Sequence, residues 1–366
     1  MEQARLLIEQ AETLGEPPED PLLLFSVLYG VWVANFVAFN GDVACDLATQ
    51  FLALAEKQRA TVPIMIGHRL MGLSLLCAGD IAAGRAHLDQ AIALYDLAEH
   101  RPLATRFGQD VGVATLSYRS QALWVLGYPE AARVDMDHAL KNAREIGQAA
   151  TLMLALAYVG LIFNRCRNHT EAIARAEELF ALAEEKGSAY WKALAMMEKG
   201  CALNLKGLAS DAIKMLISGI TAWRTTGATF RMPERLSYLA RAYAELGQCD
   251  DAWRCIGEAM TAVETTKEKW CEAEVHRFAG EIALRSPEPD AAKAEAYFER
   301  ALAVARQQQA KSWELRAATS MARLWRDQGK RDEAHDLLVP IYGWFTEGFD
   351  TLDLKEAKAV LDELNA

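Results

Sequence analysis

The sequence predicts an all-α protein: a right-handed solenoid of about eight helical hairpins, closed by a C-terminal capping helix. Three regularities support this fold class. Small residues recur at intervals of about 40 positions along the 366-residue chain. A glycine follows most of them seven positions later. A second small residue and then a large apolar residue follow at twelve and sixteen positions, as expected for two helices joined by a tight turn.

The clearest copy is the segment 235–263, where Ala240 is the small residue and Gly247 follows it. Ala252, Ile256 and Ala259 then lie on one face of the second helix. The small residues that mark the first helix of each hairpin, called anchors below, are Gly30, Gly72, Ser120, Gly160, Gly200, Ala240, Gly280 and Ala322. Repeat one is degenerate after Gly30, and Gly41 is its expected turn.

Each residue type in the pattern has a physical reason. Small side chains let two helices approach closely, and glycine ends a helix because it adopts left-handed backbone angles without a Cβ clash. The large apolar residue fills the space between hairpins. A 40-residue period also fits HEAT and armadillo arrays, but the small-residue pattern favours the tetratricopeptide (TPR) type with longer helices.

We expect one domain over residues 1–366. Residues 1–20 are predicted to form an orphan helix and turn, residues 21–345 the eight hairpins, and residues 351–366 the capping helix. The apolar face of the first helix, around Leu7, has no partner within the pattern. Three interpretations stay open: a cut from a longer polypeptide, a docking face that includes a homodimer contact, or a simple N-terminal cap.

Two segments depart from the regular repeat. The first helix of repeat one is almost wholly apolar, which fits either a membrane insertion or a helix buried between neighbours; Asn35 and the nearby glycines favour burial. The connection from Ala98 to Gly112 is polar and irregular, and it carries the candidate loop residues His100, Gln109 and Asp110. These side chains either form a ligand site or satisfy buried backbone groups at a break in the stack.

Composition restricts the partners. The chain has 39 Lys and Arg against 50 Asp and Glu, a net charge of −11, which disfavours nucleic acid and anionic membrane. No uninterrupted apolar run is long enough to cross a bilayer, and the N-terminus is unlike a signal peptide. Seven scattered cysteines without a CxxC pair fit reduced thiols in a cytoplasmic protein.

No motif for catalysis, cofactor binding or metal binding was found, so we expect no enzyme activity and no cofactor in this chain. The P-loop, GxGxxG, HExxH and GxSxG patterns are all absent.

The concave inner wall of the solenoid is then the expected binding surface. Positions −3, +1, +4 and +5 from each anchor should face it, and they carry Arg69, Gln121, Trp124, Asn164, Arg165, Asn204, Arg241, Arg277, Arg323 and Arg326. Arginine forks suit carboxylate or phosphate groups, which predicts an acidic peptide or a small anionic ligand. Pairing within the chain, with Glu234, Glu245, Glu274, Glu281 and Asp327, is the equal alternative.

Several sequence words go beyond what TPR repeats require. They include Phe107 to Val113, Ala122 to Pro129, Ala222 to Ala228, Ala310 to Ala318 and, most specifically, YGWFTEGFDT from Tyr342 to Thr351. Together they resemble the C-terminal TPR region of bacterial multidomain signalling proteins, in which a class III adenylate/guanylate cyclase and a STAND-type ATPase precede the array. The resemblance implies an intracellular sensor that restrains or releases those upstream modules. This chain lacks both modules, so no catalytic residue carries over.

Three functional readings follow. The first is a non-catalytic sensor or scaffold of a cyclase–ATPase signalling system, which binds a protein or peptide partner or the upstream domains. The second is a free-standing adaptor that takes a partner protein or acidic peptide in its concave groove. The third is a small-molecule sensor, which predicts a closed pocket in place of an open groove.

Overall fold

The computed structural model describes residues 22–365, and every regular element in that range is helical: eighteen α-helices and one 3₁₀ helix. The chain is a TPR-like α-solenoid. Its eight hairpins are α2 (Leu23–Val37) with α3 (Gly41–Gln58), α4 (Thr61–Ala78) with α5 (Ile81–Ala93), α7 (Val111–Val125) with α8 (Pro129–Ile146), α9 (Ala149–Arg165) with α10 (His169–Glu185), α11 (Ala189–Leu205) with α12 (Ala209–Thr225), α13 (Met232–Glu245) with α14 (Cys249–Thr266), α15 (Glu272–Arg285) with α16 (Ala291–Gln307), and α17 (Lys311–Asp327) with α18 (Arg331–Tyr342). The capping helix is α19 (Leu352–Asn365).

The two helices of a hairpin meet at the predicted pair of small and large residues. A Cβ added to Gly72 would lie 2.6 Å from the Leu88 side chain, and one added to Gly200 would lie 2.7 Å from Leu216. The anchor therefore has to be glycine where the opposing leucine is fully buried, because neither helix can retreat from a close-packed core. This confirms the physical role assigned to the anchor.

The turns use left-handed backbone angles at regular intervals. The residue seven positions after the anchor has a positive φ in six hairpins, at Gly79, Gly127, Arg167, Gly207, Gly247 and Gly329. A second series, at Gly147, Gly187, Gly227 and Lys267, ends the second helix of a hairpin every 40 residues. Both ends of the hairpins therefore follow the period that the sequence predicted.

The irregular connection contains two short helices. After α5 ends at Ala93, the chain forms α6 (Leu97–His100) and the 3₁₀ helix η1 (Arg101–Thr105) before α7 begins. The turn of repeat one also differs from the prediction, since Gly41 is the first residue of α3 and Asn40 is its N-cap. The Asn40 side chain accepts a hydrogen bond from the backbone N–H of Val43, which stabilises the helix start.

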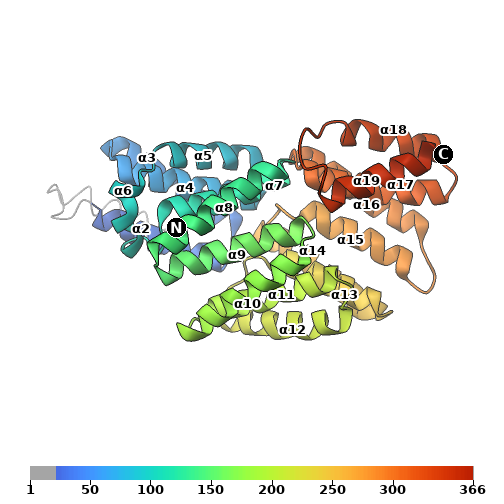
Figure 1. Cartoon of the computed structure of the whole chain (residues 1–366), viewed down its shortest axis with the longest axis horizontal. Coiled ribbons are helices and arrows are strands. Elements are labelled where there is room, and N and C mark those ends of the chain that lie inside the picture. Colours follow the sequence, from blue (N-terminus) through green and yellow to red (C-terminus); the bar gives the residue numbers. More distant parts are fainter. Residues whose placement is uncertain (1–21, 366) are drawn as a thin grey trace.

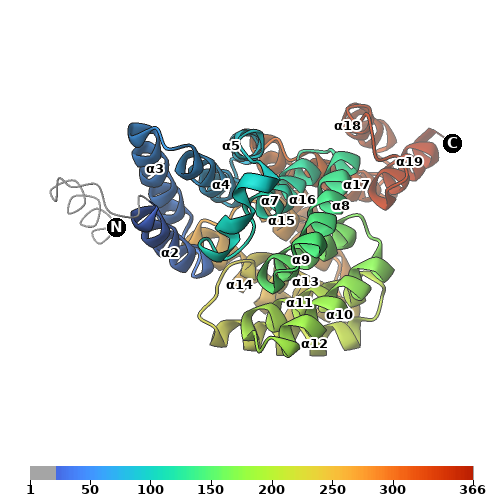
Figure 2. The ribbon, with the colours of Figure 1, turned by 60° about the vertical axis from the view of Figure 1, so that its left-hand side comes forward.

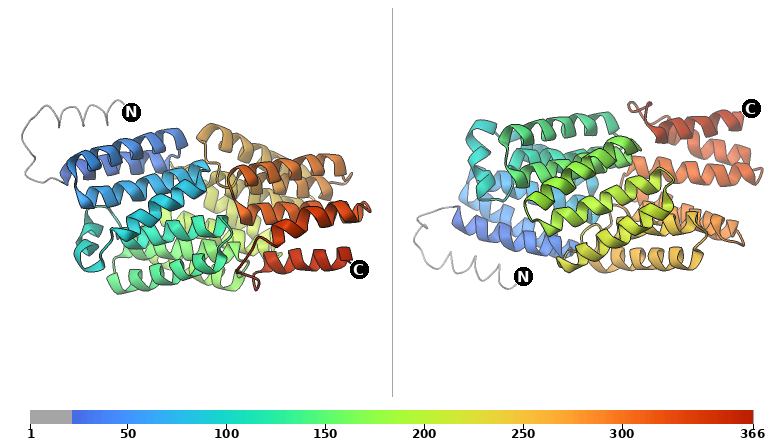
Figure 3. Two further views of the ribbon diagram at one scale, coloured as in Figure 1. Left: turned by 90° about the horizontal axis from the view of Figure 1, so that it is seen from above. Right: turned by 60° about the horizontal axis from the view of Figure 1, so that its bottom comes forward.

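The solenoid is wound so tightly that its second turn contacts its first. The C-terminal hairpins (orange to red) lie against the ends of the N-terminal hairpins (blue to teal), as Figure 1 and the two views of Figure 3 show. Figure 2 shows α9 to α12 in the bend between these two groups. The first helix of each early hairpin ends against the start of the first helix five hairpins later, so five hairpins complete one turn.

Backbone groups join the two turns directly. The carbonyl of Val37 accepts hydrogen bonds from the N–H groups of Thr229 and Phe230, at 3.0 and 3.2 Å. The carbonyl of Cys77 accepts one from Lys269 at 2.9 Å. The Ser312 hydroxyl donates to the carbonyl of Trp124, 188 residues earlier in the chain, at 2.5 Å. We call this surface the inter-turn interface: the ends of α2, α4, α7 and α9 against the segments 229–232, 268–271, 311–316 and 347–356.

Aromatic residues fill the inter-turn interface at positions where a solenoid normally has exposed turns. Phe230, Trp270 and Trp313 precede or begin α13, α15 and α17, and their exposed fractions are 3%, 0% and 1%. The Trp124 and Trp313 rings meet edge to face with centroids 4.7 Å apart. Burial of these rings stabilises the contact between the two turns.

The capping helix is also held by the first turn. Its apolar side, which includes Leu354, Ala357 and Val360, is buried against α17 and α18. In the preceding loop, the Glu347 carboxylate accepts hydrogen bonds from the backbone N–H groups of Glu130 and Ala131 at 2.9 and 3.1 Å, and so caps the start of α8. The distinctive word from Tyr342 to Thr351 therefore has a structural role in closing the superhelix.

The apolar helices near the N-terminus belong to the solenoid core. Between residues 22 and 365, only α4 is long and apolar enough to cross a bilayer, and 72% of it is buried inside the protein. The helix α2 buries Phe25, Leu28, Trp32 and Phe36. Leu23 and Val27 on its other side are exposed. The helix α2 is therefore buried on one side only, whereas the sequence predicted burial between two neighbours. The orphan helix at residues 1–20 and the homodimer contact around Leu7 lie outside the described residues.

Candidate functional site

Most of the polar residues predicted to face an open groove are buried. Seven of the ten have exposed fractions of 4% or less: Arg69, Gln121, Trp124, Asn164, Arg165, Asn204 and Arg277. Because the second turn of the superhelix covers the ends of the first, the inner wall at these positions is the interior of the protein. The open groove expected from the sequence is thus replaced, at these positions, by a packed interior with separate cavities.

Trp124 and Arg165 lie in the inter-turn interface. The Arg165 guanidinium lies over the rings of Trp270, Trp124 and Trp313, at 4.5, 5.3 and 6.0 Å from their centroids. Its nearest carboxylate is Glu234 at 3.5 Å, and burial lowers the pKa of this arginine. A guanidinium enclosed by three indoles gains cation–π stabilisation, which offsets part of its desolvation cost.

Arg69 and Gln121 are buried with atoms that lack hydrogen-bond partners. Arg69 donates through Nη2 to the Tyr29 hydroxyl at 2.7 Å, while its Nε and Nη1 make no hydrogen bond. Neither amide atom of Gln121 has a partner. A buried polar group without a hydrogen-bond partner lowers the stability of the folded protein, and such groups are rare in native structures.

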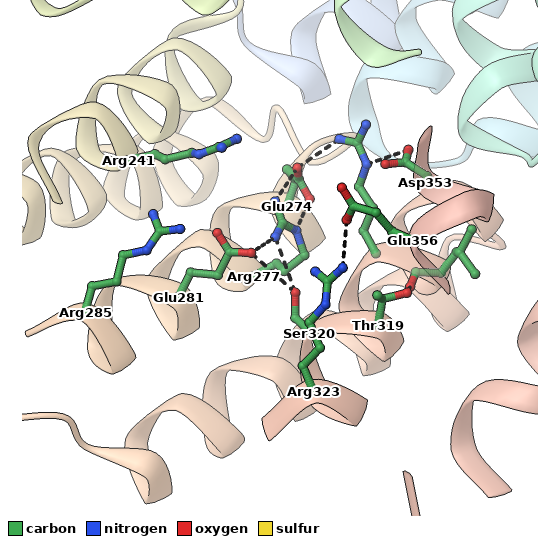
Figure 4. Close-up of polar contacts among 12 residues, drawn as sticks. Arg241, Glu274, Arg277, Glu281, Arg285, Thr319, Ser320, Arg323, Asp353 and Glu356 are labelled. Carbon is green, nitrogen blue, oxygen red and sulfur yellow. Dashed lines mark hydrogen bonds and ion pairs between the residues drawn. The ribbon is translucent and has the colours of Figure 1, made fainter. Parts of the chain in front are cut away.

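In the second turn, the arginines are paired with carboxylates (Figure 4). Arg277 donates to Glu274 at 2.7 and 2.9 Å and forms an ion pair with Glu281. Arg316 donates to Glu274 at 3.0 Å and to Asp353 at 2.9 Å. We call this group the charge cluster; its members are Arg167, Arg277, Arg316, Arg323, Glu274, Glu281, Asp353 and Glu356.

The charge cluster is balanced and nearly solid. The cluster contains four arginines and four carboxylates. The cavity lined by the arginines and by Glu281, Asp353 and Glu356 is about 20 Å³, room for little more than one water molecule. Burial alone would raise the pKa of Glu274, but the charges of Arg277 and Arg316 outweigh it and bring the pKa to about 2. The carboxylate is therefore ionised at neutral pH and holds both arginines in place.

The remaining predicted wall residues also have partners within the chain. Arg241 pairs with Glu245 at 3.0 Å, and Arg323 pairs with Glu356 at 2.9 Å. Arg326 pairs with Asp327 at 2.8 Å and also with Glu363. The amides of Asn164 and Asn204 donate to Glu198 and Glu245 at 3.2 Å. The structure thus contains the intramolecular pairing that the sequence left as the alternative; ligand binding at these residues stays a prediction.

A larger cavity of about 310 Å³, which we call the tyrosine pocket, lies between the first turn and the start of the second. Six successive hairpins contribute to its walls, from α2 to the segment before α13. Its lining consists of Tyr29, Trp32, Val33, Phe36, Val37, Leu73, Gln109, Tyr118, Leu154, Tyr158, Tyr190, Trp191, Leu194, Phe230 and Arg231. Eight of these fifteen side chains are aromatic, and Arg231 is the one charged residue among them.

The aromatic walls are packed into fixed positions. The Trp32 ring stacks on Phe36 with centroids 4.7 Å apart, and Phe36 contacts Phe230 across the inter-turn interface, also at 4.7 Å. Burial raises the pKa of Tyr158 to about 12 and also raises that of Tyr118. These hydroxyls are therefore neutral at physiological pH and can donate hydrogen bonds into the cavity.

Sequence reasoning missed this pocket because it did not consider the position two residues before the anchor. That position carries Tyr118, Tyr158, Glu198, Tyr238 and Phe278, each 40 residues apart. Neighbouring members contact each other: the Tyr118 and Tyr158 rings lie 5.2 Å apart and the Tyr238 and Phe278 rings 5.4 Å apart. A recurring aromatic at one repeat position was the available signal.

The candidate loop residues have mainly structural contacts. Asp110 is fully buried; it accepts hydrogen bonds from the Val113 N–H at 2.9 Å and the Tyr95 hydroxyl at 2.7 Å, and its own N–H donates to Thr151 at 2.9 Å. His100 accepts a hydrogen bond from the Asp96 N–H at 2.9 Å. Gln109 differs from both, since it lines the tyrosine pocket.

Within residues 22–365, no group of three or more His, Cys, Asp or Glu side chains is arranged to hold a metal ion. All seven cysteines are unpaired, and Cys77, Cys201, Cys255 and Cys271 are buried.

Comparison with known proteins supports the fold. No protein-family model matches the sequence, and no curated protein matches it. Among solved structures, a Rap protein complexed with Competence and Sporulation Factor is similar over 93% of this chain and 97% of its own, with 13% identity and a TM-score of 0.58. The Rap conjugation gene regulator of plasmid pLS20, in complex with the Phr* peptide, is similar over 82% of this chain and 76% of the regulator, with 11% identity and a TM-score of 0.54.

A protein of a different assembly has the same architecture. The APC/C hetero-tetramer Cut9-Hcn1 is similar over 93% of this chain and 55% of its own, with 13% identity and a TM-score of 0.56. At these identities the likeness concerns the fold alone, and this chain shares a TPR-like solenoid with all three proteins.

Proposed function

We propose that this protein is a non-catalytic regulatory scaffold that binds a small ligand, or the end of a peptide, between the first turn of its superhelix and the start of the second. The tyrosine pocket is the observation that carries this proposal. It is concave, mostly apolar and lined by a few convergent polar groups, which are the features of ligand sites in general. Its volume of about 310 Å³ is at the lower end of the range for such sites.

The position of the pocket suggests how binding would be transmitted. Its walls come from six hairpins and include Val37, Phe230 and Arg231, which belong to the inter-turn interface. A ligand there contacts both turns at once, so it stabilises the wound state relative to any state in which the turns separate. A partner protein that recognises one of these states would then respond to the ligand.

Two complexes of similar fold support a regulatory role, one with Competence and Sporulation Factor and one with the Phr* peptide. The finer role, a sensor array of a cyclase–ATPase signalling system in the cytoplasm, rests on the sequence words that end in YGWFTEGFDT. That finer role would be contradicted if no cyclase or ATPase module is encoded in the same reading frame as this chain or in a gene beside it.

The free-standing adaptor with an acidic peptide in its groove is the weaker candidate. It requires unpaired basic groups on the inner wall, whereas Arg241, Arg277, Arg323 and Arg326 each pair with a carboxylate. Charge reversal at Arg241 that abolished partner binding would favour this candidate over the proposed pocket.

The proposal is tested by filling the pocket. Val33 lines it from α2 and is half-buried, so Val33→Trp adds the bulk of an indole to the cavity wall. A library of organic acids, amides and short peptides would be screened by thermal shift against the wild type. We expect compounds that raise the melting temperature of the wild type but not that of Val33→Trp.

Val27→Trp is the matched control. Val27 lies on the same helix, has an exposed fraction of 42% and does not line the pocket. It should respond to the same compounds as the wild type. Stabilisation of all three proteins by every active compound would place binding elsewhere and contradict the proposal.

A further inference from the structure

Arg231 sets the chemistry of the tyrosine pocket. Its side chain is 3% exposed, and it is the single charged group in a lining that is otherwise aromatic, aliphatic or amide. The carboxylates of Glu198 and Glu234 lie near enough to balance part of this charge, and Glu198 is 3.8 Å away. A carboxylate in direct contact would add charge-assisted hydrogen bonds that Glu198 does not make.

The guanidinium is fixed in place from behind. The backbone N–H of Arg231 donates to both carboxylate oxygens of Glu268, at 2.9 and 3.1 Å, and the residue has a left-handed φ of 68°. The rings of Tyr158 and Phe230 lie 4.9 and 5.2 Å from its Cζ. These contacts anchor the residue at the inter-turn interface, where it forms part of the pocket lining.

One nitrogen of the Arg231 guanidinium has no hydrogen-bond partner within the protein. This nitrogen, Nη1, is buried. The nearest carboxylate oxygen, on Glu198, lies 3.8 Å from Nη1, outside hydrogen-bond distance. That same oxygen is already the acceptor of a short hydrogen bond from Arg235, and the other oxygen of Glu198 accepts one from Asn164 at 3.2 Å. Glu198 is therefore committed to other donors.

The rest of the pocket suits an apolar, flat body. Trp32, Tyr118, Tyr158 and Trp191 present ring faces and edges, to which an aromatic group binds by stacking and edge-to-face contacts. On the α2 side, the Tyr29 hydroxyl already accepts a hydrogen bond from Arg69 at 2.7 Å, so that hydroxyl can direct its own hydrogen toward the cavity.

We propose that the tyrosine pocket binds an aromatic monocarboxylate, with its carboxylate on the Arg231 fork and its ring among the aromatic walls. This inference rests on the proposed function and adds the class of ligand. One guanidinium matches one carboxylate, in which two parallel N–H groups can meet two oxygens. The carboxylate belongs either to a free aromatic acid or to the C-terminal aromatic residue of a peptide.

Isothermal titration with two matched pairs of probes tests the inference. The first pair is indole-3-propionate and its primary amide. The second is the dipeptide N-acetyl-Leu-Phe with a free carboxylate and the same dipeptide with a C-terminal amide. Members of a pair have the same shape and differ in charge. We expect at least one acid to bind on the order of 10- to 100-fold more tightly than its amide, the usual advantage of hydrogen bonds to a charged group.

Substitutions then locate the effect. In Arg231→Gln the preference for the acid should disappear while the affinity for the amide is retained. Should Arg231→Gln fail to fold, Arg231→Lys keeps the positive charge but loses the fork, and its acid preference should fall below that of the wild type. Val33→Trp should weaken both members of each pair, and Val27→Trp should leave all affinities unchanged.

The outcomes separate the two proposals. A tighter acid in the first pair identifies a free acid as the ligand source, and a tighter acid in the second pair identifies a peptide terminus; either result supports the inference. Equal affinity for acid and amide, or no binding of any probe to the folded wild type, overturns the aromatic monocarboxylate. In that case a thermal-shift compound that Val33→Trp abolishes still supports the proposed function, whereas the lack of any such compound overturns both.

Discussion

The tyrosine pocket and the charge cluster lie on the same inner wall, in successive turns of one superhelix, and they are filled in opposite ways. In the pocket, fifteen mostly aromatic side chains surround about 310 Å³ and contain one guanidinium. In the cluster, the cavity is only about 20 Å³, and four arginines and three of the four carboxylates line it. The inner wall of one solenoid can therefore carry either a cavity or a nearly solid group of paired charges.

The pKa values of two buried glutamates differ between the surroundings of the pocket and the charge cluster. Glu268, next to Arg231, and Glu274, in the charge cluster, are only six positions apart, and both are buried. Burial raises the pKa of Glu268 to about 7, despite hydrogen bonds from Trp270 and the Arg231 backbone. The pKa of Glu274 is about 2, because Arg277 and Arg316 outweigh the same burial effect. Direct guanidinium contact decides which environment a buried carboxyl experiences.

The largest expected effect is on the charge cluster. Glu274→Leu removes the carboxylate shared by Arg277 and Arg316 and leaves two buried cations with weakened compensation. We expect the free energy of unfolding to fall by about 3–5 kcal/mol, the usual cost of breaking a buried ion pair. Urea denaturation measures it. Glu299→Leu, at an exposed position on α16, is the control and should change stability by less than about 0.5 kcal/mol.

The second prediction uses pH to distinguish the two glutamates. A carboxyl whose pKa is raised on folding stabilises the protein below its unfolded pKa, near 4.5, and this contribution is lost as the pH rises through about 7. The stability of the wild type relative to Glu268→Gln should therefore decrease between pH 4.5 and 7, by at most about 1.4 kcal/mol per pH unit. Parallel stability curves for the two proteins would contradict the raised pKa.

Glu274 should show the opposite dependence. Because its pKa is lowered on folding, its contribution is complete above pH 4.5 and is lost as the pH falls toward 2. The Glu268→Gln protein keeps Glu274, so its free energy of unfolding should still fall as the pH is lowered toward 2.

A smaller effect is expected within the pocket. Tyr158→Phe removes one hydroxyl beside Arg231 and keeps the ring, so the free energy of unfolding should fall by about 0.5–1.5 kcal/mol. Tyr297→Phe, on α16 and away from the pocket, is the matched control. A loss above about 3 kcal/mol at Tyr158 would mean that the pocket is as rigidly interlocked as the charge cluster.

The smallest effect is expected at the partly exposed edge of the wall. Arg241 and Glu245 form an i,i+4 ion pair at 3.0 Å with side chains about one-fifth exposed. Arg241→Ala should cost about 0.3–0.5 kcal/mol, and 0.5 M NaCl should reduce that difference further. A loss comparable to that of Glu274→Leu would show that the charge cluster extends to this pair.

The sequence predicted the hairpins because their contacts are local. Gly72 meets Leu88 and Gly200 meets Leu216 within one hairpin, and such short-range pairs repeat with the period of the chain. The same reasoning predicted which residues lie on the inner wall, but it did not predict which residues pack against them. Trp124 and Arg165 were expected to face a groove, whereas they lie against Trp270 and Trp313 from the next turn.

Those surroundings depend on how far the solenoid rotates per hairpin, a small angle that accumulates over five repeats and has no signature within any one of them. The indirect signals were present: Phe230, Trp270 and Trp313 are large aromatics at turn positions where exposed polar residues are usual. An aromatic that recurs at a turn indicates a second contact surface there.

The inter-turn interface also changes how the chain should come apart. An open array frays from its ends, because each repeat depends only on its neighbours. Here the last hairpin and α19 rest on α7, α8 and α9, so deleting residues 311–365 would expose Trp124 and Arg165 in the middle of the chain. We therefore expect a single cooperative melting transition, and slow folding, since partners 188 residues apart have to meet before the coil is closed.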